Sequence, residues 1–382
     1  CTLPLSPISR NELRVSTTLR LDQFVDPNEA TVIYTRDESG TIIDARFDLS
    51  GLPRLDPMLI GRPAADVPDI VKRLCGICPV THHLAGTRAL DALIDAPITP
   101  TARAVRALLH HGSLIDAAAP KLFSTNQELA IQLKRFGKAV MAAAGCPGHF
   151  PDVAIPGGVR AAANPDLVAA LSIPELPEVL AVDAVVPDYD GYDLAVTSDN
   201  GKLDPLGTHI AAHRSGRTEL FPIQDWPRRV HETQPGAPAP RPVIGNDPYR
   251  VGPWAQQRIA ASTSNPTVAM IQRSLDAIAE LTHNPALIDG AVATEGHLRA
   301  GVGVGVVDGP RGLLVHVYTV DDAGVLVDCQ ILTPTAQNEW WLAGMLREMV
   351  DVESSIRTAD PCLPCSSAPP GQMNVTIKEE RL

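Results

Sequence analysis

Two closely spaced cysteine pairs are the residues of this sequence most suited to chemistry. The stretch RLCGICPVTHH contains Cys75 and Cys78, and the stretch ADPCLPCSSAPP contains Cys362 and Cys365. Four thiolates are soft ligands that suit zinc, iron, nickel or an iron–sulfur cluster. The pairs therefore predict a metal site built from both ends of the chain.

The spacing and the flanking residues bear on which kind of metal site this is. A closed structural zinc site usually joins pairs about 15–20 residues apart, whereas most of the chain separates these two. Arg73 and His82 flank the first pair and Asp360 precedes the second. A guanidinium, an imidazole and a carboxylate can tune the charge and proton affinity of a metal thiolate. A reactive metal centre is favoured, and a Cys₄ zinc site stays open.

The remaining cysteines are isolated in the sequence. Cys1, Cys146 and Cys329 have no cysteine neighbour, and we expect each to act as a small buried apolar residue. An odd number of cysteines without a secretory signal argues against a disulfide framework.

Composition limits the class of protein. The 382 residues are 45% hydrophobic, which is enough for one large core. The net charge is −12, which is unsuited to binding nucleic acid because that needs a basic surface. No run of about 18 apolar residues predicts a transmembrane helix. The first residues lack the basic and apolar regions of a signal peptide, and they begin with Cys1 rather than Met, so the chain is expected to be trimmed. We expect a cytoplasmic protein.

The periodicity of apolar residues predicts an α+β fold: a central helical bundle with peripheral antiparallel β-structure from both ends of the chain. Residues 12–50 alternate as strands. The period becomes helical over 67–95, which places the first cysteine pair in or at the end of a helix. Further helices are expected over 102–118, 127–144, 166–172 and 254–281, β-hairpins over 301–335, and a last helix over 339–358.

We expect a single domain spanning residues 1–382. Its predicted segments are an N-terminal β region (1–60), a helical core with the first cysteine pair (61–185), an irregular proline-rich segment (186–250), a region of helix, β-hairpin and second cysteine pair (251–368), and a tail (369–382).

The motifs around the two cysteine pairs resemble those of a known family. Residues 73–82 fit the pattern RxCGxCxxxH and residues 360–365 fit DPCxxC, the two metal-binding motifs of the large, catalytic subunit of nickel–iron hydrogenases. Three further stretches are similar to that family: DGPRG at 308–312, PGGV at 156–159 and TPTAQN at 333–338. The resemblance covers most of the chain but not residues 185–250.

The resemblance implies a nickel–iron centre that cleaves and forms dihydrogen heterolytically. Cys75, Cys78, Cys362 and Cys365 would bind nickel. Cys78 and Cys365 would also bridge to an iron that carries cyanide and carbon monoxide. Soft thiolates keep nickel redox-active, and one thiolate can accept a proton.

The resemblance also assigns roles to residues around the metals. Arg311 would lie over the centre, and Asp360 would pair with it. Pro310 and Thr335 would be among the residues that bind the cofactor, with the Thr335 hydroxyl offered to a cyanide. His82 would donate to a bridging sulfur.

A proton route and a partner are implied as well. Glu12 matches a glutamate that takes the proton from Cys362, although Leu13 replaces the glycine of that motif. Once the four paired cysteines bind metal, the chain has no further group of cysteines for an iron–sulfur relay. We therefore expect an iron–sulfur small subunit to receive the electrons, and the resemblance leaves room for further electron-transfer subunits.

The sequence departs from the family near its C-terminal end. The family carries a histidine where this chain has Ala368, and a protease cuts after that histidine. Asp56 matches the acidic ligand of a second ion, magnesium or iron, but Ala368 cannot complete that site. The segment between Asn338 and Asp360 is short, which is typical of the compact cytoplasmic lineages.

Three interpretations follow. The leading one is the catalytic subunit of a nickel–iron hydrogenase. The alternatives are a relative that has lost nickel and couples other subunits, and a non-catalytic Cys₄ zinc- or iron-binding structural subunit of a redox complex.

Overall fold

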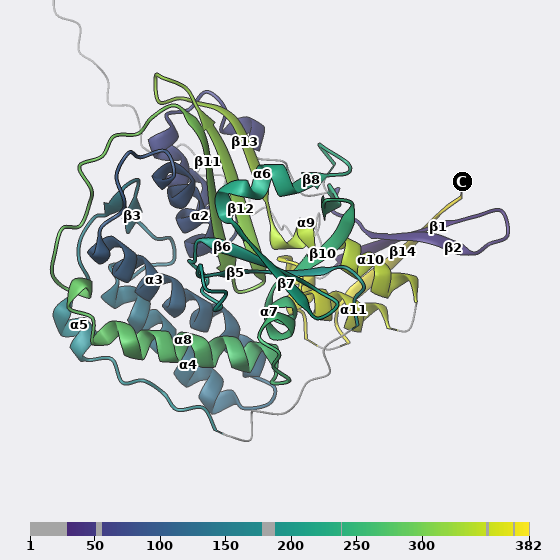
Figure 1. The fold of residues 1–382 in the computed structure, drawn as a ribbon. Coiled ribbons are helices and arrows are strands. Elements are labelled where there is room, and N and C mark those ends of the chain that lie inside the picture. The colour runs from purple at the N-terminus through teal and green to yellow at the C-terminus, as the bar shows by residue number, and fades with distance from the viewer. Residues whose placement is uncertain are drawn as a thin grey trace, which may run out of the picture.

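The computed structural model describes residues 29–50, 56–177, 188–237, 239–348, 351–369 and 371–381. Its fold is α+β, as predicted (Figure 1). Glu12 and Cys1 lie outside the described residues.

Four helices make the helical centre of the molecule: α2 (Pro79–Asp91), α3 (Pro100–Ala118), α4 (Gln127–Ala143) and α8 (Pro266–Thr282). Side chains of Thr99, Asn126 and Asn265 cap the last three by accepting from the first turn, which satisfies backbone donors that the helix leaves unpaired. The apolar faces of these helices enclose the largest core cluster. The shorter helices on the same side are α1 (Val67–Val71) and α5 (Pro165–Ala169).

A three-stranded antiparallel sheet lies against α2. Its strands are β11 (Gly301–Gly309), β12 (Gly312–Val320) and β13 (Leu326–Leu332). A Cβ atom added at Gly303 or Gly305 would lie 2.0 Å from the carbonyl oxygen of Ala89 or Ala85, both on α2. The alternating glycines of β11 therefore let the helix backbone pack directly on the strand.

Residues 186–250, predicted to be irregular, instead contain a six-stranded sheet in the order β7-β6-β5-β10-β9-β8. Its strands are short and separated by proline and glycine, so sequence alternation is weak. The strands are β5 (Tyr192–Thr197), β6 (His209–Arg214), β7 (Arg217–Pro222), β8 (Val230–Glu232), β9 (Pro242–Ile244) and β10 (Asp247–Val251). Helix α6 (Trp226–Arg229) lies between β7 and β8 in the chain, and α7 (Pro253–Ile259) follows β10.

The two ends of the chain meet in one sheet. Strands β1 (Glu29–Arg36) and β2 (Ile42–Phe47) form an antiparallel hairpin, and β14 (Asn374–Arg381) pairs in parallel with β1. Figure 1 shows this sheet extending away from the body of the molecule. The tail predicted over 369–382 thus contributes a strand. A further two-stranded ladder joins β3 (Ala154–Ile155) to β4 (Gly158–Val159).

The predicted last helix is divided into α10 (Glu339–Arg347) and α11 (Val352–Ala359), preceded by the short α9 (Pro334–Gln337). These helices and the β1–β2 hairpin enclose a separate apolar cluster. Within the described residues, no helix combines the length and the hydropathy needed to cross a membrane.

Candidate metal centre

The first cysteine pair was predicted to lie in or at the end of a helix, and it lies in the loop that joins two helices, directly before the second one. Helix α1 ends at Val71 and α2 begins at Pro79, with Cys78 as its N-cap residue. A proline disfavours helical backbone at the residue before it and is well suited to the first helical position. Pro79 therefore starts α2 directly after the cysteine loop and makes Cys78 the residue at the N-terminus of that helix.

Cys362 comes from the opposite end of the chain. Asp360 ends α11 in the left-handed conformation, with φ of 47°, and this turns the backbone towards the first cysteine loop. The backbone N–H of Cys362 donates to Oγ1 of Thr335 at 2.8 Å. Since that hydrogen bond uses the oxygen as acceptor, the hydroxyl proton of Thr335 remains able to donate elsewhere.

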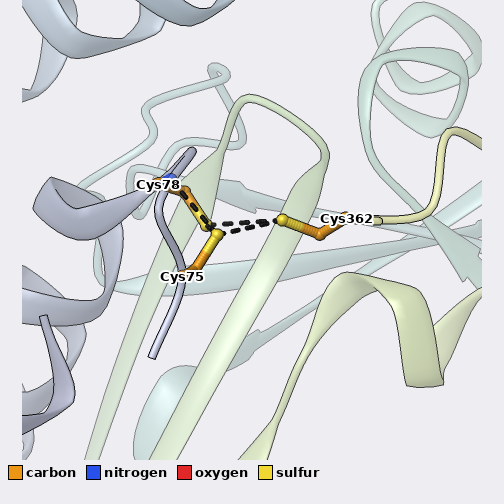
Figure 2. Close-up of side chains that lie close together, drawn as sticks. All are labelled: Cys75, Cys78 and Cys362. Carbon is orange, nitrogen blue, oxygen red and sulfur yellow. Dashed lines mark hydrogen bonds between the residues drawn. The ribbon is translucent and has the colours of Figure 1, made fainter. Parts of the chain in front are cut away.

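Three of the four paired cysteines point toward one another (Figure 2). The Sγ atom of Cys75 lies 2.7 Å from that of Cys78 and 3.0 Å from that of Cys362, and the other two are 3.8 Å apart. These sulfur atoms form the one group of potential metal ligands found within the described part of the chain. Their softness and spacing fit a thiolate-bound transition metal.

Hydrogen bonding divides the protons unequally among the three thiols. The hydrogen bonds that the Cys362 and Cys78 thiols donate to Cys75 lower the pKa of Cys75 well below its usual value. As donors to Cys75 the other two are stabilised in the neutral form: the pKa of Cys362 rises to about 12, and that of Cys78 also rises. A metal that binds here has to displace the thiol protons of Cys78 and Cys362 and replaces the shared hydrogen bonds, so its affinity depends on pH.

Cys365 lies apart from these three. Its side chain is buried in the apolar cluster beside α10 and α11, and burial raises the pKa of its thiol. To act as a fourth ligand, its side chain has to turn out of that cluster.

A cavity of about 460 Å³ surrounds the three thiols. The turn between β11 and β12 forms one wall and carries Pro310 and Arg311, and Thr335 at the start of α9 forms another. His82 and Asp56 also line it. Of the predicted site residues that the structure describes, Cys365 and Asp360 are the ones that do not line this cavity.

Arg311 holds its charge inside the cavity wall. Burial opposes that charge, but the carboxylate of Asp360 and the nearby cysteine thiolates outweigh burial and raise the pKa of the guanidinium. The Nε atom donates to Oδ1 of Asp360, which leaves the terminal nitrogens of the planar group available on the cavity side.

His82 forms a buried contact away from the thiols. Its Nδ1 lies 3.3 Å from Nε2 of His316, whose Nδ1 lies 2.6 Å from the Tyr318 hydroxyl. Burial lowers the pKa of His82 to about 4, so the imidazole is neutral at pH 7. Because Nδ1 contacts His316, the expected hydrogen bond to a bridging sulfur would have to come from the other nitrogen of His82, Nε2.

Two further residues were not identified from the sequence. Glu232 lines the cavity and accepts from Nε2 of Gln330 at 2.9 Å, and Lys121 donates to Asp360 at 2.5 Å. Glu232 lies in the segment predicted to be irregular, and Lys121 is 239 residues from its partner. Neither had a motif to identify it. Ala368 lies in the apolar cluster with Cys365 rather than beside Asp56 on the cavity.

Comparison with known proteins places this fold in one class. Residues 54–118 match the family model described as nickel-dependent hydrogenase. An NAD⁺-reducing [NiFe]-hydrogenase in the H₂-reduced state superposes with a TM-score of 0.70 at 22% identity, covering 87% of this chain and 95% of that one. The [NiFeSe]-hydrogenase of Dm. baculatum gives a TM-score of 0.61 at 17% identity, covering 87% and 95%. The fold is that of a nickel–iron hydrogenase large subunit.

Sequence relatives agree with this class. The chain is 26% identical over 421 residues to one subunit of the F420-non-reducing vhu hydrogenase of Methanococcus voltae, covering 88% of this chain and 95% of the relative. It is 24% identical over 464 residues to NAD-reducing hydrogenase HoxS subunit beta of Cupriavidus necator, covering 91% and 93%. The chain is thus a relative of the hydrogenase large subunits, oxidoreductases that act on dihydrogen. The resemblance predicted from the two cysteine motifs is confirmed, and none of these similarities favours the structural alternative.

Proposed function

We propose that this chain cleaves and forms dihydrogen at a nickel–iron centre held by Cys75, Cys78, Cys362 and Cys365. The observation that carries the proposal is the convergence of three thiols from opposite ends of the chain in one cavity, beside a buried arginine. When bound, the centre would supply a redox-active metal that polarises dihydrogen. Cyanide and carbon monoxide on the iron follow from the family resemblance.

The residues of the chain have separate tasks in this proposal. In this proposal one of the cysteine sulfurs can accept a proton while the others remain thiolate ligands. Arg311 presents fixed positive charge and N–H donors to the cavity, where low dielectric strengthens their effect on developing negative charge. Thr335 has a free hydroxyl proton for an anionic ligand, and Pro310 contributes an apolar wall.

His82 and Asp360 are positioning residues here. The neutral imidazole of His82 is held by His316, so its Nε2 can face a thiolate without introducing charge. Asp360 orients Arg311 through the ion pair between them. Glu12 remains a proposed proton acceptor for Cys362 on the basis of the family motif.

We restrict the proposed metals to the thiolate centre. A second magnesium or iron ion would draw on Asp56, but the methyl group of Ala368 offers no ligand atom.

We also propose that an iron–sulfur small subunit is the partner that removes the electrons. Cys146 and Cys329 are both buried as isolated thiols, as expected, so neither suits a cluster relay. Three apolar side chains are exposed here and would suit an apolar partner surface: Met58 and Ile60, which precede α1, and Ile77 within the cysteine loop. The unpaired thiols favour a reducing compartment such as the cytoplasm.

Infrared spectroscopy with metal analysis of the purified complex tests the centre directly. Cyanide and carbon monoxide bands with about one nickel per chain are expected. Zinc alone without these bands would contradict the proposal and favour a structural cage.

Replacement of single thiols tests the ligand set. Cys75→Ser should abolish nickel binding and hydrogen uptake together. Cys146→Ser, which changes a cysteine outside the cavity, is the matched control and should retain nickel. Full activity in the Cys75 variant would exclude Cys75 as an essential ligand.

A further inference from the structure

One glycine, Gly309, lines both the thiol cavity and a second cavity. The second one has a volume of about 560 Å³ and lies among α3, α7, α8 and β5. Gly309 lines both cavities, whereas Asp308 lines only the second one. Gly309, at the end of β11, is therefore part of a wall that the two cavities share.

Two buried polar atoms without hydrogen-bond partners flank this wall. Oγ1 of Thr81 lies on the thiol side, and a Cβ atom at Gly309 would come within 3.0 Å of it. Oδ1 of Asp308 belongs to the second cavity. Both residues are only 2% exposed. An unsatisfied buried polar atom costs stability, so a hydroxyl and a carboxyl oxygen without partners near one glycine call for an explanation.

The surroundings of Asp308 suit proton exchange. Its Oδ2 accepts from the backbone N–H of Val196 at 3.1 Å. Burial raises the pKa of Asp308 to about 6, while the N–H of Val196, the amide of Gln256 and the charge of Arg273 act in the opposite direction. A carboxyl group with a pKa near the working pH can both accept and release protons efficiently.

Other polar groups face Asp308 from each element around it. His110 on α3 contacts the Asp308 carbonyl oxygen through Nε2 at 2.9 Å, and burial lowers the pKa of His110 to about 3, so it stays neutral. The charged or titratable residues that line the same cavity are His111, Lys202, Asp204, Arg273, Asp276 and Glu280. Lys202, Asp276 and Glu280 are exposed, so the cavity leads from Asp308 to solvent.

We propose that Asp308 carries protons between the thiol cavity and solvent, by way of the Thr81 hydroxyl and water passing Gly309. This role rests on the proposed hydrogenase function and is a route separate from Glu12. A proton from the thiol side moves along the Thr81 hydroxyl to water, and the water gives up a proton as an O–H bond forms at Oδ1. The neutral acid then returns that proton to water in the second cavity, and no electron moves with it.

Two substitutions test the relay. Asp308→Asn removes the titrating group, and Thr81→Val removes the hydroxyl while keeping its shape. Each should keep parental nickel content but lower hydrogen oxidation and H₂/D₂O isotope exchange by about 10²-fold. Thr81→Val should fold at least as stably as the parent, because it removes an unpaired buried hydroxyl. Asp328→Asn, an exposed change of equal charge on β13 of the same sheet, should match the parent.

Infrared titration of the metal-free chain gives a readout independent of activity. Below a pH of about 6 the parent should show a buried carboxylic acid band that shifts in D₂O, and Asp308→Asn should lack it. If the parent is active and both Asp308→Asn and Thr81→Val keep the parental isotope exchange, the proton relay is wrong while the hydrogenase function stands. A nickel-loaded parent without hydrogen activity would instead contradict the hydrogenase function. A missing infrared band would show that Asp308 does not titrate as proposed.

Discussion

The Nε atom of Arg311 donates to Oδ1 of Asp360 at 3.2 Å, which joins the β11–β12 turn to the segment that carries Cys362. Lys121, at the end of the α3 region, binds the other oxygen of the same carboxylate. Asp360 thus ties together three segments that are remote in the sequence. The position of Arg311 in the cavity wall therefore depends on a carboxylate that lies outside the cavity.

Replacing Arg311 with lysine should impair turnover much more than metal binding. An ammonium keeps the charge but cannot pair with Asp360 and present further planar donors to the cavity at once. We expect a fall in kcat of about 10²-fold with nickel content unchanged. Arg228→Lys, at an exposed arginine paired with Asp225, is the control. A kcat equal to the parent's would remove Arg311 from the proposed machinery.

Asp360→Asn isolates the ion pair from the backbone conformation. Asparagine tolerates the left-handed conformation that Asp360 adopts, so the turn into Cys362 should be kept while Arg311 and Lys121 lose their shared partner. Because Arg311 is 9% exposed, its unpaired charge should lower the free energy of unfolding by about 1–3 kcal/mol. Urea unfolding measures this. Asp225→Asn, which breaks the more exposed pair with Arg228, should cost less than about 1 kcal/mol, and equal losses in the two variants would show that the Asp360 pair adds little.

The sequence contained enough information for the class of protein because chemistry is concentrated in short motifs. Cys75, Cys78 and Cys362 have fixed local spacing and an unusual residue type. The central helices were predictable too, since α3 and α4 have regular apolar faces and capping residues at their starts.

Other parts could not be predicted because they depend on tertiary contacts. The six-stranded sheet has strands as short as three residues, and its apolar residues are set by packing rather than by alternation. The sequence does not indicate a role for Gly309, because that role depends on the two cavities that this residue lines. The burial of Cys365 among the C-terminal helices was likewise not visible in the DPCxxC spacing.

Gly305→Ala should be strongly destabilising. A Cβ at this position would lie 2.0 Å from the carbonyl oxygen of Ala85, and the rigid backbones of β11 and α2 would have to separate. We expect a loss of about 1–3 kcal/mol in the free energy of unfolding, or more. Gly344→Ala in α10 is the matched control, because its Cβ would meet nothing within 4 Å and alanine favours a helix by about 1 kcal/mol. Equal effects of the two substitutions would contradict the packing described for β11.

Buried neutral histidines should make the metal-free chain less stable in mild acid. Burial lowers the pKa of His83 to about 4 from an unfolded value of 6.5. Its Nε2 accepts from the backbone N–H of Ala154 at 3.0 Å, so protonation also breaks that contact.

Between these two pH values the unfolded chain binds the proton and the folded chain does not, so stability falls as pH falls through this window. Asp308, whose pKa is raised to about 6, acts in the opposite direction over pH 4 to 6. A single-site comparison is therefore needed to isolate His83.

His83→Gln provides that comparison. From pH 7 to pH 5 the parent should lose about 1–2 kcal/mol more unfolding free energy than the variant, whatever the cost of the substitution at pH 7. The exposed His231→Gln is the control and should keep the parental pH dependence. Urea unfolding at the two pH values measures both differences. An identical pH dependence in parent and His83→Gln would mean that His83 is protonated without cost in the folded chain, contrary to its hydrogen bond with Ala154.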